Sequence, residues 1–175
     1  ILYVSHSPGE VARLATTLVA LDEGKVVRLG PAVEVLGDPM FTPSGVRAVG
    51  AVLEATVVTH LEDGLSLLQA GDEQLFLPHV GLEKGSRTRV RIAAQDVMLS
   101  LTKPQGISAL NIVKGSIEMI RTGEGPGAIV SLNCSAGKLL ARVTRRSVGA
   151  MGLDTGREVY AVVKTVSIAP QDVGG

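Results

Sequence analysis

The sequence predicts a mainly β protein in which two small closed barrels follow a short α/β segment. Twenty-one Gly and eight Pro residues interrupt short stretches rich in Val, Ile and Thr, which is typical of strands joined by tight turns. Hydrophobic residues make up 45% of the chain and aromatic residues only 2%, so the core has to be built from Val, Leu, Ile and Ala. The pattern of the middle of the chain returns near its end, which indicates two copies of one unit.

The composition excludes several classes of partner. Seventeen Lys and Arg residues balance seventeen Asp and Glu residues, so no broad basic field is available for nonspecific nucleic-acid binding. Charges, Gly or Pro interrupt every apolar run before the roughly 18 residues that span a bilayer. The single cysteine, Cys134, excludes an intrachain disulfide and fits a reducing compartment. We therefore expect a soluble, cytoplasmic protein that binds no nucleic acid.

An α/β segment is predicted over residues 1–44. Ser7 stands where a helix N-cap is expected, with Pro8 at the first helical position and Glu10 in the first turn. In chain order, the segment is expected to contain the end of a buried strand at residues 2–4, this helix, strands at 17–21 and 25–29, and a short helix at 31–36. A linker is predicted at residues 40–50.

Two copies of a unit of about five strands are predicted beyond the linker, over residues 50–105 and 106–175. The turn at residues 80–85 resembles the turn at 150–156, and an extended apolar segment follows each turn, at 90–101 and 159–168. Each copy opens with an apolar strand and contains hairpins, with turns expected at residues 63–64, 123–127 and 134–138. Five short strands of alternating pattern favour a small barrel of the OB type, and tandem copies can bury the face that each leaves open.

Residues 1–37 resemble the end of an ABC-transporter ATPase domain. The landmarks are the switch loop Ser5-His6-Ser7, the helix with Glu10 and Arg13, the turn at residues 22–25, and the Gly30-Pro31 step. The resemblance implies that His6, in an intact ATPase, reaches the γ-phosphate of ATP and helps to place the attacking water. No G-x-x-x-x-G-K-[ST] loop occurs in the sequence, so the cradle for nucleotide phosphates is missing. We expect a C-terminal fragment that does not hydrolyse ATP alone.

The second copy is similar to the molybdate-binding Mop domain. The motifs that carry the resemblance are Ser108-Ala109-Leu110-Asn111 with Lys114-Gly115, residues 143–147, Gly152-Leu153 with Gly156, and residues 163–166. The resemblance implies an oxyanion ligand, molybdate or tungstate, held by Ser108, the backbone amides of Ala109, Leu110 and Asn111, the side chains of Lys164 and Thr165, and the hydroxyl of Thr144. It also implies that such pockets lie between barrels, often across a subunit boundary, so that one chain can hold half a site.

The chemistry of these residue types suits a tetrahedral dianion. Molybdate has four acceptor oxygens, so its site requires converging donors and little negative charge. Hydroxyls, backbone N–H groups and an ammonium group are such donors, and charge-assisted hydrogen bonds are the stronger ones. Strand alternation places Lys164 on one face with Tyr160 and Val162. A positive charge on such an apolar face is stabilised by an anionic partner.

The sequence departs from the Mop pattern at two places. Leu110 stands where the motif usually carries Arg, which keeps a backbone donor but removes a guanidinium. The positive charge that attracts the anion could instead come from Arg142, Arg145 or Arg146. In the first copy, Gln95-Asp96 is aligned with Lys164-Thr165, and a carboxylate there repels a dianion. The first barrel is therefore interpreted as structural.

An ATPase tail joined to Mop-like barrels is the arrangement of the ATP-binding subunit of molybdate importers. The joint resemblance implies the regulatory end of such a subunit, in which bound molybdate or tungstate biases the transporter's conformational equilibrium. It further implies a homodimer or larger assembly and, in the intact protein, a membrane permease partner and a peripheral position at the inner face of the cell membrane. No His and Cys spacing suggests a bound metal ion. Two alternatives are open, a dimerisation module that binds no ligand and a sensor or storage domain for another small anion.

Overall fold

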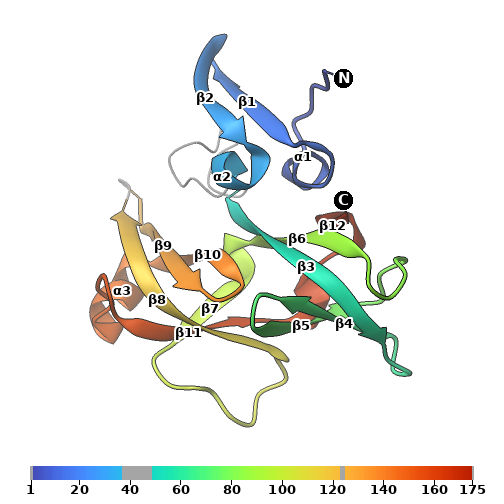
Figure 1. The fold of residues 1–175 in the computed structure, drawn as a ribbon. Coiled ribbons are helices and arrows are strands. Elements are labelled where there is room, and N and C mark those ends of the chain that lie inside the picture. The colour runs from blue at the N-terminus through green and yellow to red at the C-terminus, as the bar shows by residue number, and fades with distance from the viewer. Residues whose placement is uncertain (1, 37–48, 123–124, 175) are drawn as a thin grey trace.

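The computed structural model describes residues 2–36, 49–122 and 125–174. It contains two five-stranded antiparallel sheets and, above them in Figure 1, a two-stranded hairpin with two short helices. This arrangement confirms the mainly β architecture predicted from the sequence. Residues 40–48 of the predicted linker and residues 123–124 of the predicted turn lie outside the described residues. No helix in the described ranges is long and apolar enough to cross a membrane.

The N-terminal segment consists of α1 (Pro8–Leu14), β1 (Thr17–Asp22), β2 (Lys25–Pro31) and α2 (Ala32–Leu36). The N-cap of α1 is the one predicted, because Ser7 Oγ accepts a hydrogen bond from the backbone N–H of Glu10 at 3.4 Å. The hairpin turns through Glu23 and Gly24, which both have positive φ. Helix α1 packs against the C-terminal end of the chain and α2 packs against the first sheet.

The strand end predicted at residues 2–4 is wrong. Leu2, Tyr3 and Val4 have no regular secondary structure, and their exposed fractions are 92%, 59% and 81%. A strand requires a neighbour for its backbone hydrogen bonds. No strand in the described part of the chain pairs with these residues.

The first sheet has the strand order β12-β6-β3-β4-β5. Its strands are β3 (Gly50–His60), β4 (Leu65–Ala70), β5 (Glu73–Pro78), β6 (Arg87–Ala93) and β12 (Val173–Gly174). The predicted turn at Asp63-Gly64 joins β3 to β4, and Gly64 has a φ of 83°, a value that favours glycine. Asp63 Oδ1 accepts a hydrogen bond from the backbone N–H of Leu65 at 3.1 Å, which stabilises that turn.

The second sheet has the matching order β10-β9-β8-β11-β7. Its strands are β7 (Val97–Ser100), β8 (Asn111–Thr122), β9 (Gly127–Cys134), β10 (Gly137–Thr144) and β11 (Glu158–Val163). The helix α3 (Arg145–Met151) follows β10, and the 3-10 turns η1 (Ala94–Asp96), η2 (Thr165–Ser167) and η3 (Pro170–Asp172) follow β6 and β11. The opening strand is irregular at the same place in both copies, between Val57 and Thr59 and between Ile117 and Met119. This shared irregularity supports the predicted repeat.

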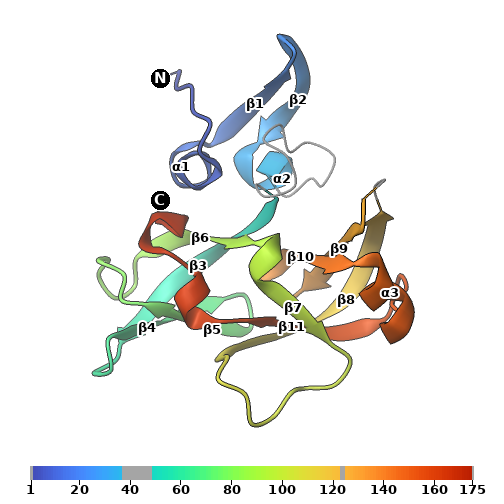
Figure 2. The ribbon, with the colours of Figure 1, turned by 180° about the vertical axis from the view of Figure 1, so that it is seen from behind.

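The two sheets exchange their last strands, which the sequence did not predict. Strand β7 follows β6 in the chain but pairs with β11, with Val97 opposite Val163. Strand β12 comes at the end of the chain but pairs with β6, with Val173 opposite Val90. Figure 2 shows β7 crossing from the first sheet to the second. Strand membership therefore does not follow the division of the chain at residue 105.

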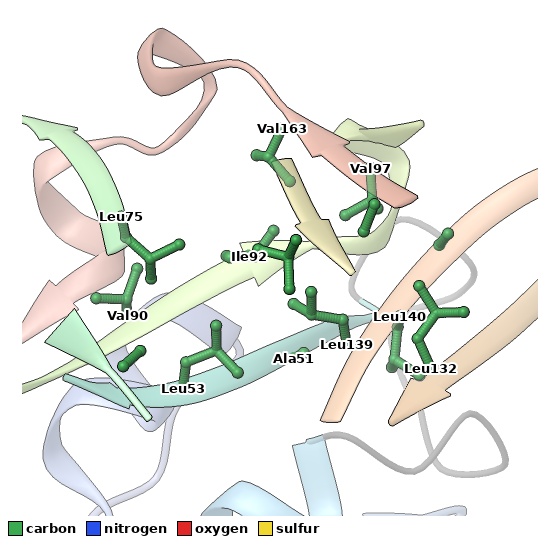
Figure 3. Close-up of a cluster of buried hydrophobic side chains, with 14 of the residues drawn as sticks. Ala51, Leu53, Leu75, Val90, Ile92, Val97, Leu132, Leu139, Leu140 and Val163 are labelled. Carbon is green, nitrogen blue, oxygen red and sulfur yellow. The ribbon is translucent and has the colours of Figure 1, made fainter. Parts of the chain in front are cut away.

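One hydrophobic core runs through both sheets. Leu53 and Ile92 from the first sheet and Leu139 and Leu140 from the second belong to the same buried cluster, and Figure 3 shows their side chains side by side. Each of the four has an exposed fraction of 2% or less. Full burial of one such side chain contributes about 1.5–3 kcal/mol. The barrels therefore support each other and hold their facing ends in a fixed arrangement.

Candidate functional site

Adjacent strands bring two of the predicted donor groups together at one end of the second sheet. Strands β8 and β11 are antiparallel, and Asn111 at the start of β8 is paired with Val163 at the end of β11. The residues just before Asn111 therefore lie beside the residues just after Val163. Neighbouring strands are about 5 Å apart. This register brings the segment that ends at Leu110 and the segment that begins at Lys164 to the same end of the sheet.

Lys164 lies just beyond the strand that was predicted to contain it. Strand β11 ends at Val163, and Lys164 is the N-cap of η2. Its side chain is exposed, and the strand alternation that was expected to place it on a face with Tyr160 and Val162 ends one residue earlier. The ammonium group makes no ion pair within the described part of the chain. It is therefore available to an anion from outside the barrel.

The hydroxyl of Thr165 points into the protein. Thr165 is only 7% exposed, and its Oγ1 is buried without a hydrogen-bond partner. A buried hydroxyl without a partner is unfavourable. Because an external ligand cannot reach this oxygen in the arrangement seen here, Thr165 can contribute its backbone rather than its hydroxyl.

Asn111 has a positioning role that the sequence did not reveal. Its side chain is 1% exposed and forms two hydrogen bonds with the backbone of Phe76 in β5. Asn111 Oδ1 accepts from the N–H of Phe76 at 2.7 Å, and Asn111 Nδ2 donates to its carbonyl oxygen at 3.0 Å. The amide thus joins the start of β8 to the edge of the other sheet. This contact uses one of the two N–H groups of Nδ2 and ties the residue that follows 108–110 to β5.

Thr144 lies away from this group. It is paired with Gly127, and the strand register places both at the other end of β8 from Asn111. Its Oγ1 accepts a hydrogen bond from the backbone N–H of Ser147 at 3.0 Å and caps α3. Thr144 also lines a groove of about 550 Å³, here called the β7–β10 groove. Arg142 lines the same groove, whereas Arg145 and Arg146 are exposed on α3.

The first copy offers no equivalent donors, but for a different reason from the one predicted. Ala93 is the N-cap of η1 with φ −71° and ψ 134°, and Lys164 is the N-cap of η2 with φ −69° and ψ 132°. Lys164 and Thr165 therefore correspond to Ala93 and Ala94, not to Gln95 and Asp96. Two alanines have no side-chain donor.

Asp96 belongs to a separate charged group of the first copy. Burial raises the pKa of its carboxyl above the ordinary value, the nearby carboxylate of Asp172 raises it further, and Arg91 lowers it. Asp172 itself forms an ion pair with Arg91, with 3.3 Å between Oδ1 and Nη1. These contacts hold η3 against β6.

Three apolar side chains, one in β7 and two close in sequence to the donor residues, are exposed, and no sequence signal pointed to them. The first of them, Met98, lines the β7–β10 groove. Met98 in β7 is 56% exposed and is paired with Val162 of β11. Leu110 and Val166 are 49% and 81% exposed. His6, the remaining predicted residue, is exposed in the N-terminal segment and makes no hydrogen bond within the described residues.

Comparisons with known proteins agree with this architecture. Residues 107–170 match the family model of the TOBE domain. The chain is 43% identical over 99% of its length to a molybdenum import ATP-binding protein ModC from Mesorhizobium japonicum, of which it covers 48%. It is 41% identical over 96% of its length to the protein of that name from Rhizobium etli, of which it covers 47%. The chain thus spans about half the length of these curated relatives.

A solved structure supports the fold. The cytoplasmic molybdate-binding protein ModG, in a form with molybdate bound, matches with a TM-score of 0.61 and 24% identity. The match covers 70% of this chain and 94% of that chain. At this level of identity the likeness concerns the fold alone, and it confirms the architecture of small OB-like barrels. Together, the relatives and the TOBE match show that the chain is similar, over nearly its whole length, to about half of a molybdenum import ATP-binding protein.

Proposed function

We propose that the chain is the oxyanion-binding regulatory part of the ATP-binding subunit of a molybdate importer. The observation that supports the proposal is the register of β8 and β11, in which Asn111 is paired with Val163, so that the segments holding Ser108 and Lys164 meet the second sheet at the same end. Lys164 supplies a positive charge, and the hydroxyl and backbone N–H groups are neutral donors. Such a set matches the four acceptor oxygens of molybdate or tungstate.

We propose further that one chain holds only part of the site and that a second copy completes it. Ser108 and Lys164 are exposed, and so are Leu110 and Val166, each two residues away from one of them in the sequence. Exposed apolar groups beside an anion site are suited to burial at a protein interface. A partner covering them would also exclude water, which strengthens the contact of Lys164 with the anion. The homodimer or larger assembly then forms the complete site.

The proposed regulation rests on the thermodynamic linkage between anion binding and the conformation of the protein. A bound anion shifts a conformational equilibrium only by the difference between its affinities for the two states. If the anion binds only where two copies meet, it favours the conformation in which they are together. In the intact protein, which we propose to act with a membrane permease at the inner face of the membrane, this would couple intracellular oxyanion to transport. ATP binding and a catalytic role for His6 would belong to that intact protein.

The experiment is a calorimetric titration of molybdate into this chain and into Lys164→Ala. Loss of one charge-assisted contact is expected to weaken binding about ten- to a hundredfold. The matched control is Lys25→Ala, which removes an exposed lysine from the distant β1–β2 hairpin (Figure 1). Sulfate should bind less tightly than molybdate, because donors set for a larger tetrahedron cannot all reach it.

The outcomes separate the proposal from its alternatives. Equal molybdate affinity of Lys164→Ala and the parent chain would show that the site lies elsewhere. A parent chain that dimerises but binds neither molybdate nor tungstate would be a dimerisation module. Tighter binding of a different small anion at Lys164 would indicate a sensor or storage domain for that anion.

A further inference from the structure

A second cleft lies between the N-terminal segment and the outer face of the first sheet. Its volume is about 760 Å³, and we call it the α1 cleft. Helix α1 and the residues that follow it form one wall, and strands β3, β4 and β6 form the other. The lining residues are Arg13, Leu14, Thr16, Glu54, Ala55, Thr56, Val58, Gln69, Gly71, Arg87, Thr88 and Arg89. None of them belongs to the site proposed above.

Three arginines from two separate parts of the chain meet in this cleft. Arg87 and Arg89 are two residues apart on β6, so their side chains leave the same face of the strand about 7 Å apart. Gly174 in β12 is paired with Arg89. The side chain of Arg13 packs directly on Gly174, where an added Cβ would overlap it. Arg13 in α1 is thereby held beside Arg89.

Within the described residues, the positive charges that line the cleft outnumber the negative ones. Glu54, opposite Arg89 in the strand register, is the single carboxylate among the lining residues. Arg89 also donates a hydrogen bond to the carbonyl oxygen of Ala15 at 2.8 Å. Within the described part of the chain, Arg13 and Arg87 form no hydrogen bond or ion pair. Three guanidinium groups against one carboxylate leave an excess of two positive charges, which a bound anion would neutralise.

We propose that the α1 cleft binds a small anion of the diphosphate class. The guanidinium group presents its donors in a fork that fits phosphate oxygens in a bidentate manner. A ligand with at least two negative charges matches the excess, and the hydroxyls of Thr16 and Thr56 and the amide of Gln69 add neutral donors at the walls. The volume also leaves room for an organic group attached to the diphosphate.

Such a ligand would fasten the N-terminal segment to the first barrel. Arg13 comes from α1, whereas Arg87 comes from β6, so an anion between them joins the two parts of the chain. It would neutralise the repulsion between neighbouring guanidinium groups at the same time. The occupied cleft would therefore resist separation of the ATPase-like segment from the barrels more strongly than the empty one.

The test is a calorimetric titration of inorganic pyrophosphate into the chain, in magnesium-free buffer at low salt. The chain should bind it, and Arg13→Gln and Arg87→Gln should each weaken binding about tenfold or more. Arg121→Gln is the matched control, because Arg121 lies in β8 outside the cleft. A parallel titration with a nucleoside diphosphate distinguishes the sources of the ligand, since tighter binding than pyrophosphate shows that the organic group is also recognised.

The result that would overturn the proposal is no pyrophosphate or nucleoside diphosphate binding up to millimolar concentration, or equal affinity in all three Arg→Gln variants. Melting temperatures without ligand verify that each variant is folded. Lys164→Ala should leave pyrophosphate binding unchanged, and Arg87→Gln should leave molybdate binding unchanged. These two controls show whether the proposal for the α1 cleft or the proposal for the molybdate site is wrong.

Discussion

Replacing Asn111 by alanine should destabilise the protein far more than replacing an exposed asparagine. The Asn111→Ala substitution removes two hydrogen bonds to the backbone of Phe76, of 2.7 and 3.0 Å, from a side chain that is 1% exposed. Each hydrogen bond contributes about 1 kcal/mol, and a buried group left unpaired costs about 1–3 kcal/mol. Because Phe76 is half-buried on an edge strand, water can satisfy part of that loss. We expect a decrease of about 2–4 kcal/mol in the free energy of unfolding.

Urea unfolding followed by circular dichroism measures this change. Asn133→Ala is the matched control, since Asn133 is exposed on β9 and its side chain makes no hydrogen bond in the described ranges. The control should change the free energy of unfolding by less than about 0.5 kcal/mol. An equally small effect of Asn111→Ala would refute the claim that this amide joins the two sheets.

Three further substitutions test other parts of the structure. Thr165→Val should leave molybdate affinity unchanged. It should raise the free energy of unfolding, measured in urea, by up to about 1 kcal/mol, because it replaces a buried hydroxyl that has no hydrogen-bond partner. A decrease would show that the hydroxyl does have a partner. Asp96→Asn should raise the melting temperature at pH 7 but not below about pH 4, because burial raises the pKa of this carboxyl in the folded state and its ionised form therefore opposes folding; a gain that persists at pH 3 would contradict this sign. Gly71→Ala should cost more than about 2 kcal/mol in urea unfolding, since its φ is 55° and a Cβ would overlap the backbone of Ser135. Gly64→Ala, at φ 83° with open space around it, should cost clearly less, and equal costs would show that the overlap is relieved.

Local features were predictable where residue chemistry alone decides them. Ser7 before Pro8 predicted the start of α1, and Asp63-Gly64 predicted the first hairpin turn. These signals depend mainly on neighbouring residues in the sequence. The repeat of two barrels was predictable for a similar reason, because matching turns recur along the chain.

The exchange of strands depends on contacts that the sequence does not display. Strand β7 has four residues and β12 has two, which is too short for an alternating pattern to mark a strand or its partner. The pairing is decided by which apolar face each strand can bury against the shared core. The misplaced correspondence of Lys164 with Gln95 has the same origin. Both apolar runs allow more than one alignment, and only the caps of η1 and η2 select Ala93 as the partner of Lys164.

The candidate site was partly predictable. The resemblance to the Mop domain implied that Ser108 and Lys164 are donors, and the register of β8 and β11 brings the segments that hold them to the same end of the sheet. Their role as ligand donors stays a prediction. Asn111 and Thr144 carry donors too, but their side chains already serve the protein, one bonded to Phe76 and the other capping α3. A motif shows which groups are present. Whether a group is free for a ligand depends on what surrounds it.

The most direct test of the central claim is to locate molybdenum itself. Crystals of the chain grown with molybdate should show an anomalous difference peak, at the molybdenum absorption edge, beside Lys164 Nζ and the backbone of residues 108–110. A second copy of the chain should cover Leu110 and Val166 at that peak. A molybdenum atom found instead beside Ala93 in the first barrel, or next to Thr144 in the β7–β10 groove, would contradict the account.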